Sequence, residues 1–280
     1  MIDLVRVLGA LMRVMMLGWE FPPFSSGGLG THCYGLVNAM GEKDDVDITF
    51  VMPDEEGPPG TVRKLGMKKG RIIKIGSSIK PYEQSGKMLV KMVGGKKESY
   101  SKDFFDSVVK YNEVAVEAAL QEEFDVIHCH DWMTFMAGVN LKQRTKKPLV
   151  VTVHSTESDR TGDNPNSWIS HIEWTGTYNA DKVITVSAMM KDQLITRYGV
   201  PKEKIEVIYN AVRHEDFTPG RIKSKLGDKI VLFLGRVTLQ KGLDYLLEAA
   251  KLVVEKDKSV KFVIVGKGDQ LHQMIERAVH

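Results

Sequence analysis

Short runs of apolar residues recur along this chain, and most are followed by a segment whose apolar residues repeat at helical spacing. The runs predict strands at Arg13–Gly18, Asp47–Met52, Asp125–Cys129, Pro148–Val153, Lys182–Val186 and Ile205–Ile208. Continuous apolar strands that alternate with helices are typical of parallel sheets covered on both faces. The sequence therefore predicts an α/β fold with a doubly wound parallel sheet.

A loose stretch at Thr218–Asp228 interrupts this alternation and predicts a linker. A chain of 280 residues has room for two domains, and the first is expected over residues 12–217 with an insertion at 57–100. A second repeat over 229–280 supplies two strands and part of a second helix. Because that is too little for a doubly wound domain, the second domain is predicted to be incomplete.

The insertion is strongly basic, since Arg63–Lys97 contains eleven lysines and arginines and a single acid, Glu83. The whole chain carries a net charge of only +3, which does not call for a nucleic-acid partner. We interpret the basic segment as a solvated surface insertion. The alternative is peripheral contact with an anionic membrane through residues 63–97.

Two cysteines, Cys33 and Cys129, are far apart and fit no metal-binding or redox spacing. Both are predicted to be reduced core residues of a cytoplasmic protein. No apolar run approaches the roughly 20 residues of a membrane-spanning helix, and Met1–Leu11 is too weakly apolar for a secretory signal.

A glycine-rich loop, Trp19–Thr31, follows the first strand, and a helix is predicted over Thr31–Lys43 with Thr31 as its N-cap. Gly27 and Gly28 would let a ligand approach the backbone closely, and a helix start offers unpaired N–H groups to a phosphate. The alternative is a tight turn that needs glycine for chain geometry alone.

Other polar residues fall at predicted strand ends, where open parallel sheets bind ligands. Simpler interpretations stand beside the functional one: a helix cap for His130 and Asp131, a loop-backbone partner for His154, and a solvated basic loop for Arg236 and Lys241. The residues are His130, Asp131, His154, Asn210, Arg236 and Lys241.

A nicotinamide-binding enzyme is a further alternative, because Asp54 lies near the place of a ribose-binding acid. The loop WEFPPFSSGGLG, however, does not match G-x-G-x-x-G, and Gly266-Lys267-Gly268 lacks the third glycine. No HExxH or paired-cysteine motif is present, so the prediction is a reaction without a metal ion.

Taken together, the motifs resemble those of GT-B glycosyltransferases, in particular the glycogen and starch synthase-like branch of family 4. The matching segments are WEFPPFSSGGLGTHCYGL (19–36), DVIHCHDW (125–132), TVHSTESDRTG (152–162), IEW…ADKVITVS (172–187), VIYN (207–210) and GRVTLQKGLDYLLEAA (235–250). The resemblance implies two Rossmann-like domains, the second incomplete here. It also implies retaining transfer of a hexose, usually glucose, from a nucleoside diphosphate to a glucan or other sugar acceptor.

The resemblance also implies roles for single residues. His154 is expected to contact the donor sugar at the catalytic centre, and Asp131 to contact sugar hydroxyls on the acceptor side. Glu157 and Asn210 are expected to make sugar or loop contacts. The partners implied are a nucleotide sugar and a glucan or oligosaccharide, with no cofactor beyond the substrate, ADP-glucose or UDP-glucose.

The same resemblance assigns the donor diphosphate to the glycines Gly27 and Gly28 and to the cations Arg236 and Lys241. Two cations beside a helix start match the charge of a leaving diphosphate. The sequence departs from the starch-synthase pattern at Ser25, where that branch has lysine. This leaves the choice between ADP-glucose and UDP-glucose open.

A downstream Glu-x₇-Glu segment, which in the family contacts donor sugar and ribose, is absent from the 280 residues. The resemblance therefore predicts little or no transferase activity for this chain alone. Two further alternatives stay open: a membrane-associated glycosyltransferase that acts on a lipid-linked acceptor, and an inactive fragment that binds glucan or nucleotide.

Overall fold

The computed structural model describes residues 11–22, 27–54, 56–58, 60–66, 70–77, 92–93, 96–97, 102–162, 164–217 and 229–279. The linker predicted at Thr218–Asp228 lies outside these residues. The chain forms two compact units, and each is described by itself. The first unit consists of Met1–Pro81, Tyr100–Glu157 and Pro165–Arg213, and the second of Tyr82–Ser99, Ser158–Asn164 and His214–His280.

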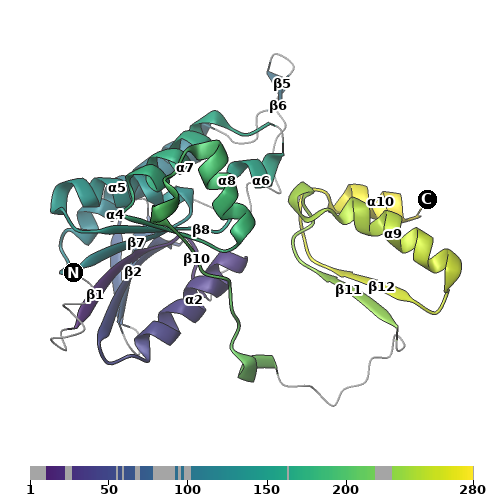
Figure 1. Ribbon diagram of the computed structural model, residues 1–280, viewed down its shortest axis with the longest axis horizontal. Coiled ribbons are helices and arrows are strands. Elements are labelled where there is room, and N and C mark those ends of the chain that lie inside the picture. Colours follow the sequence, from purple (N-terminus) through teal and green to yellow (C-terminus); the bar gives the residue numbers. More distant parts are fainter. Residues whose placement is uncertain are drawn as a thin grey trace. The chain divides into compact units, whose positions relative to one another are not determined.

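The first unit is built on an eight-stranded sheet with the strand order β10-β9-β8-β7-β1-β2-β4-β3 (Figure 1). Its strands are Met12–Leu17 (β1), Val46–Asp54 (β2), Val62–Gly66 (β3), Arg71–Gly76 (β4), Val126–His130 (β7), Leu149–Val153 (β8), Lys182–Thr185 (β9) and Ile205–Val207 (β10). Neighbouring strands pair in parallel from β10 through to β4. The six predicted strands and their parallel arrangement are confirmed.

The edge strand β3 is an exception, because it pairs antiparallel with β4. The expectation of a purely parallel sheet is wrong at this edge. Residues 67–70 are all that join the two strands, whereas a parallel pair needs a crossover of about a dozen residues or more. The short connection therefore dictates a hairpin.

Helices cover both faces of the sheet, which confirms the doubly wound arrangement (Figure 1). Alternate residues of β1 feed two separate cores: Met15 and Leu17 lie in one, Val14 and Met16 in the other. The first core includes residues of α4, α5, α7 and α8, and the second includes residues of α2. The helices are Gly28–Gly41 (α2), Lys102–Ala119 (α4), Trp132–Thr145 (α5), Glu157–Thr161 (α6), Ser167–Asn179 (α7) and Ala188–Tyr198 (α8).

Helix α8 begins and ends on local signals that the sequence announces. The Oγ of Ser187 accepts the backbone N–H of Met190 at 3.1 Å, as an N-cap serine does. Gly199 follows the helix with φ 63°, the left-handed conformation that glycine adopts without strain.

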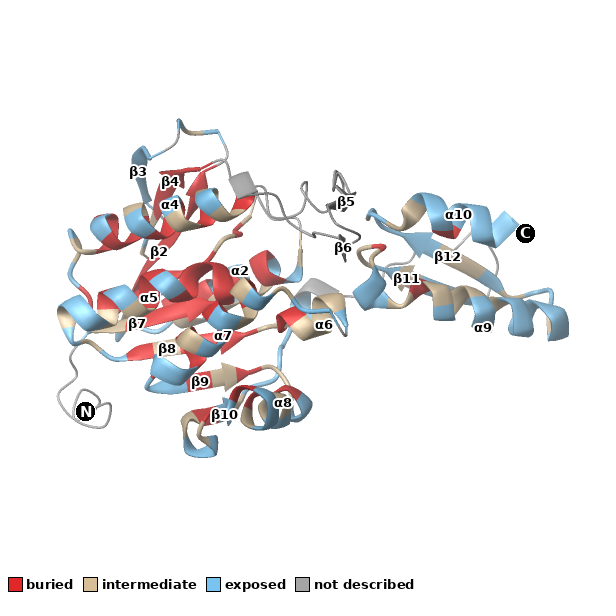
Figure 2. Ribbon diagram, turned by 90° about the horizontal axis from the view of Figure 1, so that it is seen from above, coloured by how far each residue is buried: buried red, intermediate tan, exposed pale blue. Residues whose placement is uncertain are grey.

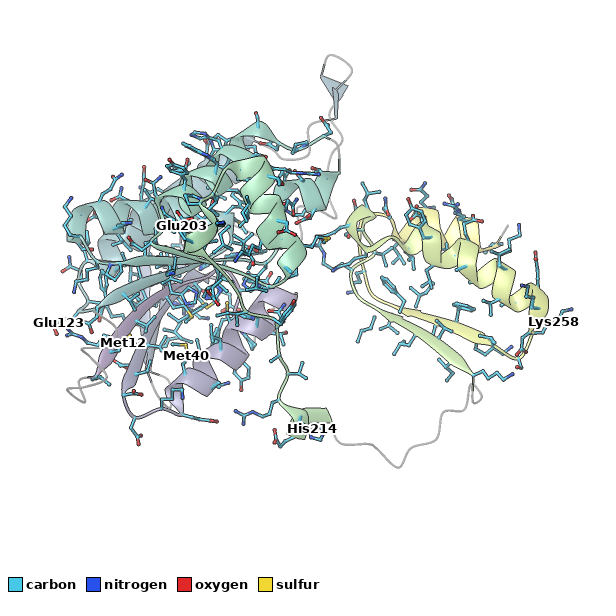
Figure 3. All side chains as sticks on the ribbon, in the orientation of Figure 1. Met12, Met40, Glu123, Glu203, His214 and Lys258 are labelled. Carbon is cyan, nitrogen blue, oxygen red and sulfur yellow. The ribbon has the colours of Figure 1, made fainter. Side chains whose placement is uncertain are left out.

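Ion pairs tie together the amino-terminal ends of two central strands. The backbone N–H of Arg13 donates to Asp125 at 2.9 Å, and its guanidinium donates to the same carboxylate at 3.0 and 3.1 Å. Arg13 also pairs with Glu123, which Figure 3 labels at the same edge as Met12. Ion pairs and hydrogen bonds within the protein therefore occupy the amino-terminal edge of the sheet.

The basic insertion begins on β3 and β4, and three of its described cations have acidic partners. The Nε of Arg63 donates to the buried Asp54 carboxylate at 2.7 Å. Lys64 and Arg71 both pair with Glu122, at 2.6 and 2.8 Å. These pairs reduce the positive charge that this region presents to an anionic surface, and they give Asp54 a structural partner rather than a ribose. Residues 78–91 of the insertion lie outside the described ranges.

The second unit contains a parallel pair of strands, Ile230–Leu234 (β11) and Lys261–Val265 (β12), with the helices Leu243–Lys256 (α9) and Leu271–Val279 (α10). Its buried apolar residues are Val237, Leu243 and Met274. Figure 2 shows much of both strands as exposed or intermediate. The unit also includes the two-residue strands Met92–Val93 (β5) and Lys96–Lys97 (β6), which pair antiparallel.

Short 3₁₀ turns complete the described elements at Lys202–Lys204, His214–Phe217 and Leu239–Lys241. Among the described residues, no helix is both long enough and apolar enough to span a bilayer. Both cysteines are buried and free, as predicted.

Candidate active site

The carboxyl ends of β7, β8 and β10 and the start of α2 bring polar side chains together in the first unit. His130 closes β7, Asp131 follows it, and His154 follows β8. Asn210 lies after β10, close enough to His32 of α2 to influence the pKa of its imidazole. Neighbouring parallel strands end at the same edge of a sheet, so residues far apart in sequence meet here.

Asp131 holds the backbone at the centre of this edge. Its Oδ1 accepts the backbone N–H of His154 at 2.7 Å, and its own N–H donates to the carbonyl of Thr152 at 3.0 Å. It is the N-cap residue of α5 by position, yet its carboxylate makes no capping hydrogen bond. The simple helix-cap interpretation of this residue is therefore wrong, because the side chain joins two strand ends instead.

The backbone of Asp131 is strained. It has φ 59° and ψ 168°, a combination that is essentially restricted to glycine and costs about 1–3 kcal/mol in other residues. The surrounding hydrogen bonds hold it in place: Thr152 accepts its N–H, and Thr134 donates its N–H and Oγ1–H to the Asp131 carbonyl. Strain of this kind clusters at functional sites, which supports the choice of Asp131 as a site residue.

His154 lies half-buried beside a second histidine. Its Nε2 is 3.2 Å from Nδ1 of His130, and the two rings stack with centroids 5.5 Å apart. Burial lowers the pKa of the His154 imidazole to about 4, so the ring is neutral at neutral pH. A neutral imidazole can accept or donate a hydrogen bond, which suits contact with a sugar hydroxyl.

The histidines around His154 form a buried group whose pKa values are all depressed. His128 and His130 are fully enclosed, and burial lowers the pKa of His128 to about 3 and that of His130 well below its usual range. The Nε2 of His128 lies 2.8 Å from the Oγ1 of Thr152. These rings are neutral at neutral pH and shield His154 from bulk water.

His32 is a site residue that the sequence analysis missed. It lies on the first turns of α2, with its ring 4.5 Å from the ring of His154 and 5.5 Å from that of His130. Burial and the neighbouring His154 lower its pKa to about 4. The available signal was its place directly after the glycine loop, in GGLGTH.

The glycine loop leads directly into α2, but the helix begins earlier than predicted. Gly27 is the N-cap and Gly28 the first helical residue, so the prediction of Thr31 as N-cap is wrong. The Thr31 N–H and hydroxyl both point back to the Gly27 carbonyl, as expected inside a first turn. Among the residues that the structure describes, a Cβ at Gly28 would meet no atom within 4 Å.

Part of the α2 amino terminus is already satisfied by a carboxylate. The buried side chain of Glu20 accepts the N–H of Gly30 at 3.2 Å. A negative charge at a helix start is favourable, and it takes one of the N–H groups that a phosphate would otherwise use. A diphosphate at Gly27 and Gly28 would therefore depend on the remaining amides.

Glu157 is buried in a network that supports the loop before α7. Its Oε1 accepts the N–H of Asn166 at 3.3 Å, and its own N–H donates to Glu173 at 2.8 Å. Glu173 also accepts the hydroxyl of Tyr198 at 2.6 Å. Asn166 caps α7 by accepting the N–H groups of Trp168 and Ile169. The expected loop contact of Glu157 is present, while a sugar contact stays a prediction.

The second unit carries Arg236 and Lys241 on the loop between β11 and α9. Lys241 is exposed and Arg236 is partly exposed. Gly242 follows with φ 60° and begins α9. Both cations therefore lie near a helix start, as predicted, and their role in binding a diphosphate stays a prediction.

The glycines Gly266 and Gly268 have a packing role in this unit. A Cβ at Gly268 would lie 1.9 Å from the Val237 carbonyl oxygen, and one at Gly266 would lie 1.7 Å from that of Gly235. The Val237 N–H also donates to the carbonyl of Lys267 at 2.8 Å. Close contact between two loops, rather than a dinucleotide, explains these glycines.

Comparison with known proteins matches two consecutive parts of the chain to glycosyltransferase families. The Glycosyltransferase Family 4 profile matches residues 26–216, and the profile of Glycosyl transferases group 1 matches residues 215–280. An uncharacterized glycosyltransferase of Methanocaldococcus jannaschii is 30% identical over 92% of this chain and 64% of its own length. A glycogen synthase of Mycobacterium tuberculosis is 24% identical over 95% of this chain and 64% of its own length.

Solved structures agree at the level of the fold. The catalytic domain of starch synthase IV from Arabidopsis thaliana, bound to ADP and acarbose, has a TM-score of 0.63 at 15% identity and covers 96% of this chain and 70% of its own. A structure named trehalose-6-phosphate from E. coli, bound with UDP-2-fluoro glucose, has a TM-score of 0.65 at 12% identity. It covers 95% of this chain and 69% of its own.

The doubly wound parallel sheet of the first unit and the parallel βα repeat of the second match the GT-B fold of these solved structures, and both matching profiles are those of glycosyltransferases. Within that class the chain belongs to Glycosyltransferase Family 4, whose profile covers more than half of it. It spans 64% of the length of the two curated relatives described above.

Proposed function

We propose that the protein transfers a hexose, glucose, from a nucleoside diphosphate sugar to a glucan or other sugar acceptor with retention at the anomeric carbon. One observation carries the proposal: His154 is held at the carboxyl edge of the sheet by the strained residue Asp131. The names of the relatives support it, since one is a glycogen synthase and one fold relative was solved with ADP and acarbose.

In the proposed reaction the chain's residues position the sugar and stabilise charge. The neutral His154 imidazole would hydrogen-bond a hydroxyl of the donor sugar, and Asp131 would fix the backbone that carries His154 and contact the acceptor sugar. The acceptor hydroxyl would attack on the side of the leaving group, and a phosphate oxygen would take its proton. Most of the rate enhancement would come from orientation.

For the donor diphosphate, the contacts proposed in the second unit are Arg236 and Lys241, and those proposed in the first unit are Gly27 and Gly28 at the start of α2. Two cations would offset charge that develops on the leaving group, which is a major source of stabilisation in group transfer. The proposal needs no cofactor apart from the donor, ADP-glucose or UDP-glucose. The buried free cysteines fit a reducing compartment, so we place the reaction in the cytoplasm.

A soluble sugar acceptor is favoured over a lipid-linked one by the ion pairs on the basic insertion. Arg63, Lys64 and Arg71 are each bound to an acidic side chain of the same unit. Each basic residue near an anionic bilayer contributes about 1 kcal/mol only while its charge is available. Pairing within the protein lowers that contribution.

The test is transfer itself, measured on a chain that also includes the family's Glu-x₇-Glu segment, because the 280 residues alone are predicted to have little or no activity. The protein would be incubated with UDP-glucose or ADP-glucose and maltoheptaose, with the nucleoside diphosphate and the elongated glucan both measured. Arg236→Ala is expected to lower the rate about 10²-fold, equivalent to about 3 kcal/mol. Lys251→Ala, at an exposed position on α9, is the matched control and should leave the rate unchanged.

The stereochemistry of the new bond decides the mechanism. Retention predicts an α-linked product from an α-linked donor, which proton NMR of the product distinguishes directly. Binding of neither nucleotide sugar, together with the absence of transfer to any sugar acceptor, would contradict the proposed function.

A further inference from the structure

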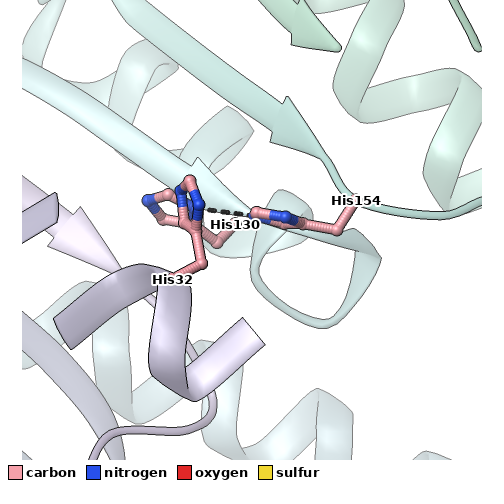
Figure 4. Close-up of side chains that lie close together, drawn as sticks. All are labelled: His32, His130 and His154. Atoms are coloured by element: carbon pink, nitrogen blue, oxygen red, sulfur yellow. Dashed lines mark hydrogen bonds between the residues drawn. The ribbon is translucent and has the colours of Figure 1, made fainter. Parts of the chain in front are cut away.

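Three histidines converge at the carboxyl edge of the first unit from three separate elements. His32 comes from α2, His130 from the last position of β7 and His154 from the residue after β8 (Figure 4). Each imidazole offers one nitrogen, and these three nitrogens all lie within 4.8 Å of one another. We propose that His32, His130 and His154 form a binding site for a divalent transition-metal ion, with Zn²⁺ as the expected occupant.

The spacing is close to what tetrahedral zinc requires. Zinc–nitrogen bonds of about 2.0–2.1 Å place neighbouring tetrahedral ligands about 3.3 Å apart. The separation between His130 Nδ1 and His154 Nε2 is already 3.2 Å. His32 is partly exposed, so a small rotation of its side chain would bring its nitrogen into range.

The surroundings orient the ligands in the way that metal sites require. Histidine ligands commonly use their second ring nitrogen to hydrogen-bond a fixed polar group, which sets the ring orientation. The Asn210 side chain, which lies close enough to His32 to influence its pKa, is placed to serve that purpose. Asp131 fixes the backbone of His154 at 2.7 Å and supplies a nearby negative charge that would offset a dication.

The donor set selects the class of metal. Three imidazoles suit Zn²⁺, Cu²⁺, Ni²⁺ and Fe²⁺, whereas Mg²⁺ and Ca²⁺ prefer oxygen ligands. Three protein ligands would leave a fourth position open to water or to an oxygen of a bound molecule. If the proposed function holds, an ion here would occupy the imidazole of His154 and compete with the donor sugar. The binding site itself does not depend on that function.

Direct metal binding tests the proposal without any activity assay. The full chain, prepared without a histidine tag and freed of metal with a chelator, would be titrated with Co²⁺ and followed by visible absorption. We expect one Co²⁺ per chain, displaced by Zn²⁺. His32→Ala and His154→Ala should each weaken binding by more than about 10-fold, the loss that even an outer-shell substitution produces.

The matched control is His272→Ala, because His272 is exposed on α10, outside the three-histidine cluster. This variant should bind Co²⁺ as the wild type does. Circular dichroism would show that each variant is folded. Absence of binding at micromolar Co²⁺, or affinity that is unchanged in both His32→Ala and His154→Ala, would overturn the proposal.

X-ray absorption of the zinc-loaded wild-type chain decides the question if a variant fails to fold. A nitrogen shell with imidazole scattering supports the three-histidine site. A shell dominated by oxygen or sulfur assigns the ion elsewhere and overturns the proposal.

Discussion

The carboxylate of Asp131 accepts the backbone N–H of His154 at 2.7 Å and thereby joins the carboxyl ends of β7 and β8. Asp131 makes this contact from a backbone conformation of φ 59° and ψ 168°. Replacing it by glycine would relieve the strain, worth about 1–3 kcal/mol, and remove the hydrogen bond. We therefore expect Asp131→Gly to lower the rate of sugar transfer strongly while the free energy of unfolding changes little.

This prediction is checked by measuring transfer and urea unfolding on the same preparation. Asp131→Asn separates the contribution of the hydrogen bond from that of the negative charge, because its amide oxygen is uncharged and can still accept the His154 N–H. It should be more active than Asp131→Gly. Equal transfer by wild type and Asp131→Gly would contradict a role in positioning His154.

Two glycines of this chain should respond to alanine in opposite ways. At Gly268 a Cβ would lie 1.9 Å from the Val237 carbonyl oxygen, so Gly268→Ala must displace a loop and is expected to cost about 1–3 kcal/mol or more. At Gly28 a Cβ would meet nothing, and alanine is the better helix former by about 1 kcal/mol. Gly28→Ala should therefore be neutral or slightly stabilising.

Hydrogen exchange of the amides in residues 229–279 measures the destabilisation that Gly268→Ala causes in the second unit. Thermal unfolding of the first unit measures the effect of Gly28→Ala. The prediction fails if Gly268→Ala leaves protection in 229–279 unchanged.

The hydroxyl of Tyr198 belongs to a buried hydrogen-bond network. It donates to the buried Glu173 carboxylate at 2.6 Å, and that carboxylate also accepts the N–H of Glu157. Tyr198→Phe removes one hydrogen bond to a buried charge, so we expect it to lower the free energy of unfolding by about 1–3 kcal/mol. Tyr178→Phe, at an exposed position on α7, should stay within about 0.5 kcal/mol. Similar values for the two variants in urea unfolding would refute the proposed importance of the Glu173 network.

Asp125 should make stability depend on pH in the acid range. Hydrogen bonds from Arg13 hold the pKa of this carboxyl below its usual value. The unfolded chain therefore binds the proton more readily, and the stabilisation is present above the unfolded pKa of about 3.9 and lost as pH falls through the folded pKa. Asp125→Asn should be less stable than wild type at pH 6, and the difference should shrink below about pH 4.

Acid titration of unfolding, followed by circular dichroism, measures this difference. A difference between wild type and Asp125→Asn that stays constant from pH 6 to pH 3 would show that the ion pair with Arg13 is not its source.

Much of the fold could be predicted because its signals are local. Buried parallel strands are continuous apolar runs, so β1, β2, β7, β8 and β9 lie where the sequence places them. The Ser187 cap was equally predictable, since capping depends on residues three apart. The start of α2 was misjudged, because a threonine is a common cap and Gly27 offers no side chain to announce one.

Part of the candidate site could be found in the same way. Asp131, His154 and Asn210 each follow a predicted strand, and the rule that ligands bind at strand ends singles them out. His32 could not be found from the strand-end rule, because it lies inside a helix and has an ordinary helical neighbourhood. Its importance appears only once α2 packs beside the ends of β7 and β8.

By itself, the sequence determined the alternation of strands and helices, the buried cysteines and the positions of His154 and Asp131 at strand ends, since each depends on neighbours along the chain. Tertiary structure decided the antiparallel edge strand β3, the strained backbone of Asp131 and the meeting of His32 with His130 and His154. The reason is physical: these features arise from contacts between residues as much as 122 positions apart, and short-range residue patterns carry no record of such contacts.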